Sequence, residues 1–400
     1  MTSIPADIFQ QLQDDSTASV DQMLQRSIGH FRQSRNATEM FEAMKMRVRH
    51  GLSLPLVAGD DDDPIANDVE QQFEAGLLDA CREAGIMLIQ DGKIGEGWMY
   101  LRPLADNELA NQLLSKVEIT DDNYDEMIHI LLHEGVDVRR GYRAVLDHQG
   151  TCNSITLFDQ AIVGRSKQDR QAAAGELLDH FYSELTSMVR DDVSQRDKDH
   201  PELQNQDGSW PKLDDQTLGD LVAARKWLLQ DGVYHLDTTH LSAVVRNAAV
   251  LDDEQAWQKA RELVAYGRRL HHEFQYPGDE PFVDFYPAYA AYYDVLLGTH
   301  VDAGLNQFKR KAETVDSDQH GTSAIETYVD LLHRIGRHSD AISEAIRLVP
   351  DDVPSQQIVP LLLDYASHCQ DTDAYQPIAD YCKKQNDVLG FTAVMHAMKA

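Results

Sequence analysis

Glu126, His129 and His133 are the residues whose types and spacing point most directly to metal chemistry. They stand at i, i+3 and i+7, so a helix would place all three on one face. A glutamate with a histidine three residues later is half of the ligand set of di-iron helical bundles. The sequence holds no second Glu-x-x-His, and Asp330 with His333 is a poor substitute. We therefore expect a structural or surface role for this trio, with divalent-metal binding as the alternative.

His235 and His240 form a second histidine pair, on either side of a short polar run. Asp237 or Thr238 can accept hydrogen bonds as the N-cap of a helix that starts there, which explains this run without a metal. In the metal alternative this pair must converge with the Glu-His trio, because several ligands have to meet at one ion. The zinc signature His-Glu-x-x-His is absent.

The sequence contains no nucleotide-binding or serine-hydrolase motif. It lacks the phosphate-binding loop Gly-x-x-x-x-Gly-Lys-Ser/Thr, a Gly-x-Gly-x-x-Gly after a strand, and the nucleophile elbow Gly-x-Ser-x-Gly. We therefore expect no catalytic residues and no cofactor, and we favour a role other than that of an enzyme.

An aromatic-rich stretch at 274–293 is the main candidate for a binding surface. Aromatic residues at helical spacing usually pack in a core. Tyrosine and phenylalanine beside prolines also make good recognition surfaces. The candidate contact residues are Tyr276, Phe285, Tyr286 and Tyr289, together with Trp98 from an earlier segment.

These residues must be positioned by helices, because apolar residues recur at helical spacing along most of the chain. Two related motifs, GKIGEGW at 92–98 and GRHSDAI at 336–342, follow amphipathic stretches. In each, the glycine can close one helix in the left-handed conformation, and the acid can begin the next helix near its positive end. The small residues Gly97 and Ala341 would allow the two helices to approach closely.

A β-hairpin is the competing interpretation of residues 86–101, because apolar runs flank the turn there. Helices are favoured, since helix-forming sequence precedes the first run and strict alternation is missing.

The two hairpins, near 79–103 and 323–350, resemble the tetratricopeptide repeat, a helix–turn–helix unit of about 34 residues. The matching small and bulky positions are Gly85, Leu88, Gly97 and Leu101 in the first hairpin and Val329, Leu332, Ala341 and Ala345 in the second. Val329 replaces a small residue, Ala345 replaces a bulky one, and the closing proline is misplaced in both. The resemblance implies an irregular α-solenoid whose concave surface binds peptides or proteins, without catalytic residues.

Composition narrows the class of partner. The chain of 400 residues has 67 acidic and 36 basic residues, a formal net charge of −31, which disfavours nucleic acid and anionic lipid as partners. The four cysteines are widely separated, which argues for reduced thiols and a cytoplasmic protein. No apolar run could span a bilayer, and the N-terminal residues lack the features of a signal peptide. The acidic run at 60–63 is expected to be a solvated loop.

The sequence thus predicts an all-α protein in two helical halves. The expected parts are an N-terminal region at 1–190, a polar linker or long loop at 191–215, and a C-terminal repeat region at 216–400. The expected function is that of a cytoplasmic scaffold or adaptor that binds a protein or peptide. A helical metal-dependent enzyme and a small-ligand sensor are the alternatives, and homo-oligomer formation is left open.

Overall fold

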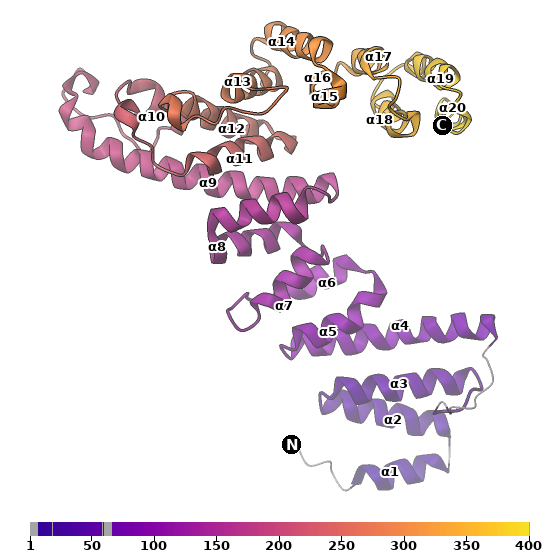
Figure 1. The fold of residues 1–400 in the computed structure, drawn as a ribbon. Helices are drawn as coiled ribbons and strands as arrows, with labels where there is room; N and C mark the ends of the chain where they lie inside the picture. The colour runs from indigo at the N-terminus through magenta and orange to yellow at the C-terminus, as the bar shows by residue number, and fades with distance from the viewer. Residues whose placement is uncertain (1–6, 18, 58, 60–65, 400) are drawn as a thin grey trace. The chain divides into compact units, whose positions relative to one another are not determined.

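The structure is a computed structural model that describes residues 7–17, 19–57, 59 and 66–399, and these contain helices and turns but no β-strand (Figure 1). The predicted all-α class is therefore confirmed. Residues 86–101 belong to two helices, so the competing β-hairpin is wrong. No helix in the described part of the chain has both the length and the apolar character needed to cross a membrane. The acidic run at 60–63 and the first six residues lie outside the described ranges.

The chain divides into two compact units, Met1–His148 and Gln149–Ala400. Helix α8 (Val138–Leu157) runs across this division, but its backbone is interrupted at Gly150, where φ is 75° and ψ is 177°. A positive φ is accessible to glycine without steric penalty, so the helix can break at this residue. We expected the division at the polar segment 191–215. It lies upstream of that segment, between His148 and Gln149.

The first unit is a series of helices, of which the first four each pack on the next one in the sequence. The helices are α1 (Asp7–Ser16), α2 (Val20–Gln33), α3 (Ala37–Gly51), α4 (Asn67–Gln90), α5 (Ile94–Leu101), α6 (Asn107–Leu114) and α7 (Tyr124–Ile128), followed by a π-helical turn at His129–His133 and then α8. One apolar cluster, which includes Ile28, Met40 and Leu88, joins α2, α3 and α4. A second, around Leu114 and Met127, joins α4 to the helices that follow.

The second unit begins with a long helix and continues as a chain of shorter ones. Helices α10 (Leu218–Ala224), α11 (Thr238–Asn247) and α12 (Glu254–Gly267) pack against α9 (Lys167–Arg196). The remaining helices are α13 (Phe285–Leu296), α14 (Val301–Thr314), α15 (Ser317–His320), α16 (Ser323–Arg334), α17 (His338–Leu348), α18 (Ser355–Ser367), α19 (Tyr375–Lys384) and α20 (Val388–Ala397). From α16 onward each helix packs on the next, and α17 also contacts α19 as α18 contacts α20.

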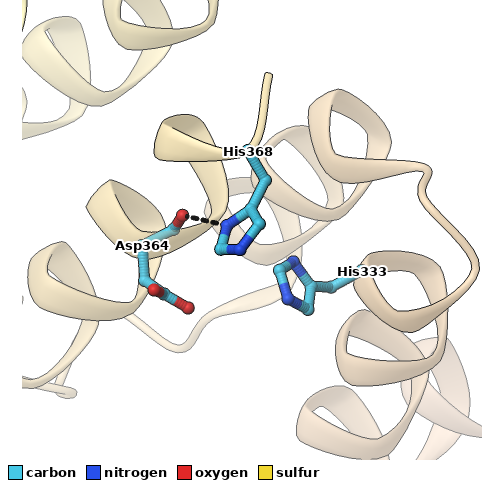
Figure 2. Close-up of side chains that lie close together, drawn as sticks. All are labelled: His333, Asp364 and His368. Carbon is cyan, nitrogen blue, oxygen red and sulfur yellow. Dashed lines mark hydrogen bonds between the residues drawn. The ribbon is translucent and has the colours of Figure 1, made fainter. Parts of the chain in front are cut away.

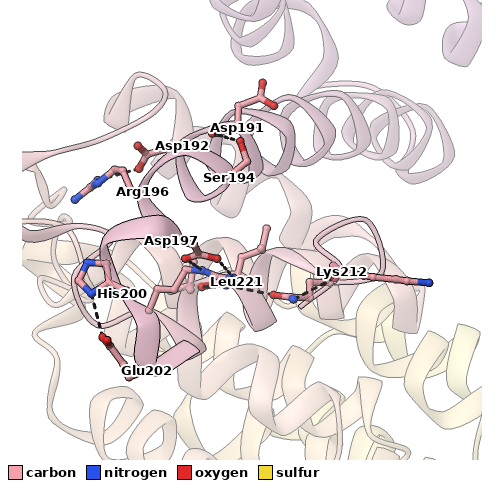
Figure 3. Close-up of polar contacts among 12 residues, drawn as sticks. Asp191, Asp192, Ser194, Arg196, Asp197, His200, Glu202, Lys212 and Leu221 are labelled. Atoms are coloured by element: carbon pink, nitrogen blue, oxygen red, sulfur yellow. Dashed lines mark hydrogen bonds and ion pairs between the residues drawn. The ribbon is translucent and has the colours of Figure 1, made fainter. Parts of the chain in front are cut away.

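The polar segment 191–215 is attached to the second unit by several contacts (Figure 3). Helix α9 extends into it as far as Arg196, whose guanidinium binds Asp192 and lies over the Trp227 ring. Asp197 forms a buried ion pair with Arg225, with both nitrogen–oxygen distances at 2.8 Å. The segment that the sequence suggested as a linker is thus held by a two-bond ion pair at its start.

Among the described residues, one type of helix-ending turn closes six helices: α2, α3, α4, α13, α16 and α19. In each, a residue with positive φ donates its N–H to the carbonyl three residues back, and the next residue donates five back. The positive-φ residues are Arg35, Ser53, Gly92, Gly298, Gly336 and Asn386. Three of these six are glycines, and only Gly92 and Gly336 are followed by a basic residue, which explains why the motif is visible just twice in the sequence.

Helices α4 and α5 approach each other through two glycines. A Cβ at Gly85 would lie 2.6 Å from the Leu101 side chain, and one at Gly97 would lie 2.8 Å from Ile89. Neither distance is sterically acceptable, so both positions require glycine unless the neighbouring side chains shift. The expected close approach at Gly97 is confirmed.

Candidate functional site

A cavity of about 360 Å³ lies between α13, α14 and α16 in the second unit, and we call it the aromatic hollow. Its apolar side is formed by Ala249, Phe282, Ala288, Tyr289, Tyr292 and Phe308. Its polar side is formed by three residues of α16: Glu326, Thr327 and Asp330. The hollow therefore offers an aromatic wall that faces two carboxylates.

The aromatic wall is held by edge-to-face packing. The Phe282 and Tyr292 rings each meet the buried Phe308 ring edge-on, at centroid distances of 5.6 and 6.2 Å. Tyr289 and Tyr292 are three residues apart on α13, so one helical face carries both rings into the hollow. Phe308 and Tyr292 are buried, whereas Phe282 and Tyr289 are only half-buried. The two half-buried rings are the ones that a bound ligand can reach.

The two carboxylates of the hollow differ in their surroundings. Glu326 is exposed and accepts a hydrogen bond from the Thr322 hydroxyl. Desolvation raises the pKa of Asp330 above its ordinary value, although the Arg334 guanidinium, 3.6 Å away, opposes this shift. Glu326 is thus the carboxylate that is most available to a cationic group of a ligand.

Arg334 fixes α16 beside the hollow. Its side chain is only 6% exposed and donates to the Ala249 carbonyl at 2.6 Å and to the Tyr292 hydroxyl. It forms an ion pair with Asp252 at 3.0 Å, and its guanidinium lies over the rings of Trp257 and Tyr292. One cation therefore joins α16 to α13 and to the segment between α11 and α12.

A second cavity, of about 530 Å³, continues from the aromatic hollow across α16 to α17 and α18. Its other lining residues are Thr322, Ile325, Val329, Ala345, Val349, Val353, Gln357, Ile358, Leu361 and Tyr365. Glu326 and Asp330 line both cavities, so the two adjoin at this pair of acids. We call the combined surface the groove. It is apolar at both ends and acidic in the middle.

The candidate contact residues of the aromatic stretch have different environments. Phe285 and Tyr286 are 5% and 1% exposed, and the Tyr286 ring lies against Gly267, where a Cβ would meet it at 2.2 Å. Tyr289 lines the aromatic hollow. Tyr276 is half-buried and donates its hydroxyl hydrogen to Asp279 at 2.8 Å. Of this group, Tyr289 is the residue that lines the aromatic hollow.

Trp98 lies in the first unit together with two of the candidate metal ligands. It lines a cavity of about 440 Å³ with Glu126 and His129. Glu126 Oε2 accepts a hydrogen bond from the Gly95 N–H at 3.2 Å, and His129 Nε2 lies 3.4 Å from Glu134. The ring centroid of His133 is 6.3 Å from that of His129. The structure thus brings Trp98, Glu126 and His129 to one cavity.

His235 and His240 belong to the second unit. The His235 ring contacts the Tyr266 hydroxyl at 2.8 Å and Asp192 at 3.3 Å, and burial lowers its pKa. Asp237 caps α11 by accepting a hydrogen bond from the Thr239 N–H at 2.8 Å, which confirms the expected cap. His240 is half-buried within α11. His235 is thus bound to a tyrosine and an aspartate.

A different group of possible metal ligands comes together at His333, Asp364 and His368 (Figure 2). Their ligand atoms all lie within 4.8 Å of one another, and no other group of this kind is found among the residues described. In the sequence, His333 stood out only as a possible partner of Asp330. The missed signal is Asp364 and His368 at i and i+4, which one helical face would present together. Their approach to His333 depends on helix packing, which the sequence does not reveal.

Comparison with family models, with curated protein sequences and with solved structures gives no match for this chain. Function must therefore be argued from the chain's own residues.

Proposed function

We propose that this chain is a non-catalytic helical-repeat protein, similar to tetratricopeptide proteins, that binds a peptide segment of a partner in the groove. The observation that carries the proposal is the pattern of the groove, which has apolar walls on both sides of Glu326 and Asp330. A segment with a lysine or arginine flanked by apolar side chains has the complementary pattern.

The helical-repeat part of the proposal is supported by the recurring hairpin. The α4–α5 and α16–α17 pairs share the same glycine-ended turn, and α4 and α5 meet closely at two small residues. In the second unit, α13, α14, α16, α17 and α18 all contribute residues to the groove, so successive helical hairpins line one surface. An irregular α-solenoid would bind its ligand on such a surface. The four free cysteines favour a cytoplasmic scaffold.

The groove can be tested with a displayed peptide library panned against the full-length protein. We expect enriched peptides to share a basic residue between aromatic or aliphatic ones. Glu326→Lys and Tyr289→Ala should each weaken a selected peptide by about tenfold, as loss of a well-placed interface side chain commonly does. Glu326 is exposed and Tyr289 is half-buried, so circular dichroism should establish that both variants fold.

Tyr234→Ala is the matched control, because Tyr234 is an exposed tyrosine of the same unit that does not line either cavity. It should bind the selected peptides as the parent protein does. The proposal fails if no related peptides are enriched, or if their affinity is the same in all three variants.

A further inference from the structure

We propose that His333, Asp364 and His368 bind a divalent transition-metal ion of the Zn²⁺ type, which would join α16 to the C-terminal end of α18 (Figure 2). This inference rests on a separate cluster of side chains and does not depend on the groove.

The donor atoms and their spacing suit such an ion. Two imidazole nitrogens and one carboxylate oxygen form a common ligand set for zinc, with bonds of about 2.0–2.2 Å. Atoms bound to one zinc at these distances are about 3.4 Å apart, and the three ligand atoms already lie within 4.8 Å of one another. Asp364 and His368 are exposed, so small rotations of their side chains can close the remaining distance.

The hydrogen bonding of His368 leaves a suitable nitrogen for the metal. Its Nδ1 lies 2.8 Å from the backbone oxygen of Asp364. A carbonyl oxygen only accepts, so Nδ1 carries the hydrogen in this bond and Nε2 carries the lone pair. The same arrangement orients metal-binding histidines in other proteins. In Figure 2 the His333 and His368 rings lie next to each other, edge to face at a centroid distance of 5.1 Å, and the Asp364 carboxylate lies near both.

His333 is held in place by two neighbouring rings. It stacks on Tyr365 at a centroid distance of 4.2 Å, and its Nδ1 lies 3.0 Å from Nδ1 of His338. When His333 donates this hydrogen bond, its Nε2 has the lone pair that a metal requires.

An ion can reach this cluster from solvent. A cavity of about 460 Å³ is lined by His338, His368, Cys369 and Asp371, among others. The net charge of −31 attracts cations to the protein as a whole. Because the ligands come from α16 and from the end of α18, a bound ion would resist separation of these helices and stabilise the folded state.

The test is titration of the full-length protein, stripped with a chelator and desalted, with Zn²⁺ by calorimetry and with Co²⁺ by visible absorption. We expect one ion per chain at this cluster, a Co²⁺ spectrum typical of nitrogen and oxygen ligands, and a higher melting temperature with Zn²⁺. His368→Asn and Asp364→Asn should each weaken binding by at least about tenfold and remove the increase in melting temperature. Both side chains are exposed, so circular dichroism can establish that the variants fold.

The matched control is the double variant His271→Asn, His272→Asn, because these adjacent histidines have ring centroids only 4.2 Å apart but lie outside the cluster. It should bind both metals as the parent protein does. The proposal is overturned if the parent protein binds no Zn²⁺ or Co²⁺, or if His368→Asn and Asp364→Asn bind them unchanged.

Discussion

At the scale of single residues, Arg334 does the most to hold the groove together. Its guanidinium is almost completely buried, yet two of its nitrogens donate to backbone carbonyls, and Asp252 and Asp330 supply opposite charge. A buried cation is tolerated only when such partners compensate for lost hydration. Removing it would leave the Ala249 carbonyl and the Tyr292 hydroxyl without this donor, and it would open a void beside Trp257.

We expect Arg334→Ala to lower the free energy of unfolding by about 1.5–3 kcal/mol, the usual effect of losing a hydrogen bond from a charged group, since the partner carboxylates remain partly solvated. Arg334→Lys keeps the charge but loses the planar guanidinium and its several donors. It should therefore be more stable than Arg334→Ala and less stable than the parent protein. Urea denaturation followed by circular dichroism measures both. If the two variants are as stable as the parent protein, Arg334 does not hold α16 in place.

The second prediction at this scale concerns His235 and pH. Burial lowers the pKa of His235 below 6.5. The Asp192 carboxylate opposes this shift, and the positive charge of Arg196 adds to it. The unfolded state, with the ordinary value of 6.5, therefore binds a proton that the folded state does not. Stability due to His235 is present above pH 6.5 and falls as the pH drops below it.

Unfolding measured from about pH 8 to about pH 5 should show this loss in the parent protein. The slope should be smaller in His235→Asn, which has no titrating ring. His271→Asn, which removes an exposed histidine, should keep the slope of the parent protein. Equal slopes for the parent and His235→Asn would contradict the prediction.

The aromatic stretch at 274–293 shows how far the residues of the groove could be predicted from the sequence. Its composition drew attention to Tyr289, which lines the aromatic hollow. Spacing alone could not show that Tyr286 packs against Gly267 whereas Tyr289 lines the hollow. Tertiary packing decides which face of α13 meets α12. Glu326 and His368 were missed for the same reason, since their partners lie on other helices.

At the scale of the element, the recurring turn was predicted in part. A glycine marks this turn in the sequence at Gly92 and Gly336, whose φ angles are 79° and 81°. At Arg35 and Asn386 the same left-handed conformation is adopted by a residue with a side chain, so a search for glycine fails there. Asparagine tolerates this conformation better than most residues, and Arg35 gains an ion pair with Asp91 on the neighbouring hairpin.

We expect Gly336→Ala to lower the free energy of unfolding of the second unit by about 1–2 kcal/mol, the strain of a left-handed alanine. Nothing lies within 4 Å of the added Cβ, so backbone strain is the only cause. Gly175→Ala is the matched control, because Gly175 lies inside α9 and its Cβ would make only an ordinary contact at 4.0 Å. That variant should be more stable, by up to about 1 kcal/mol. Denaturation curves that shift in the same direction for both would contradict this account.

At the scale of the whole molecule, the helical class was predictable because apolar periodicity is a local property of the sequence. The position of the division into units was not. Composition pointed to the polar segment 191–215, but the buried Asp197–Arg225 pair attaches this segment to the second unit. The break lies instead near a single residue, Gly150, in a stretch of ordinary helical composition.

Two units with separate apolar cores should unfold separately. Residues Met1–His148 contain two apolar clusters of their own, and α9 with α10, α11 and α12 provides packed helices for Gln149–Ala400. We expect each segment to fold when expressed alone and the full chain to unfold in two transitions, which match those of the segments. Calorimetry of the three proteins makes the comparison, and Arg334→Ala and Gly336→Ala should lower only the transition of Gln149–Ala400. A single transition of the full chain, lowered as a whole by either variant, would mean that the two units unfold as one cooperative body.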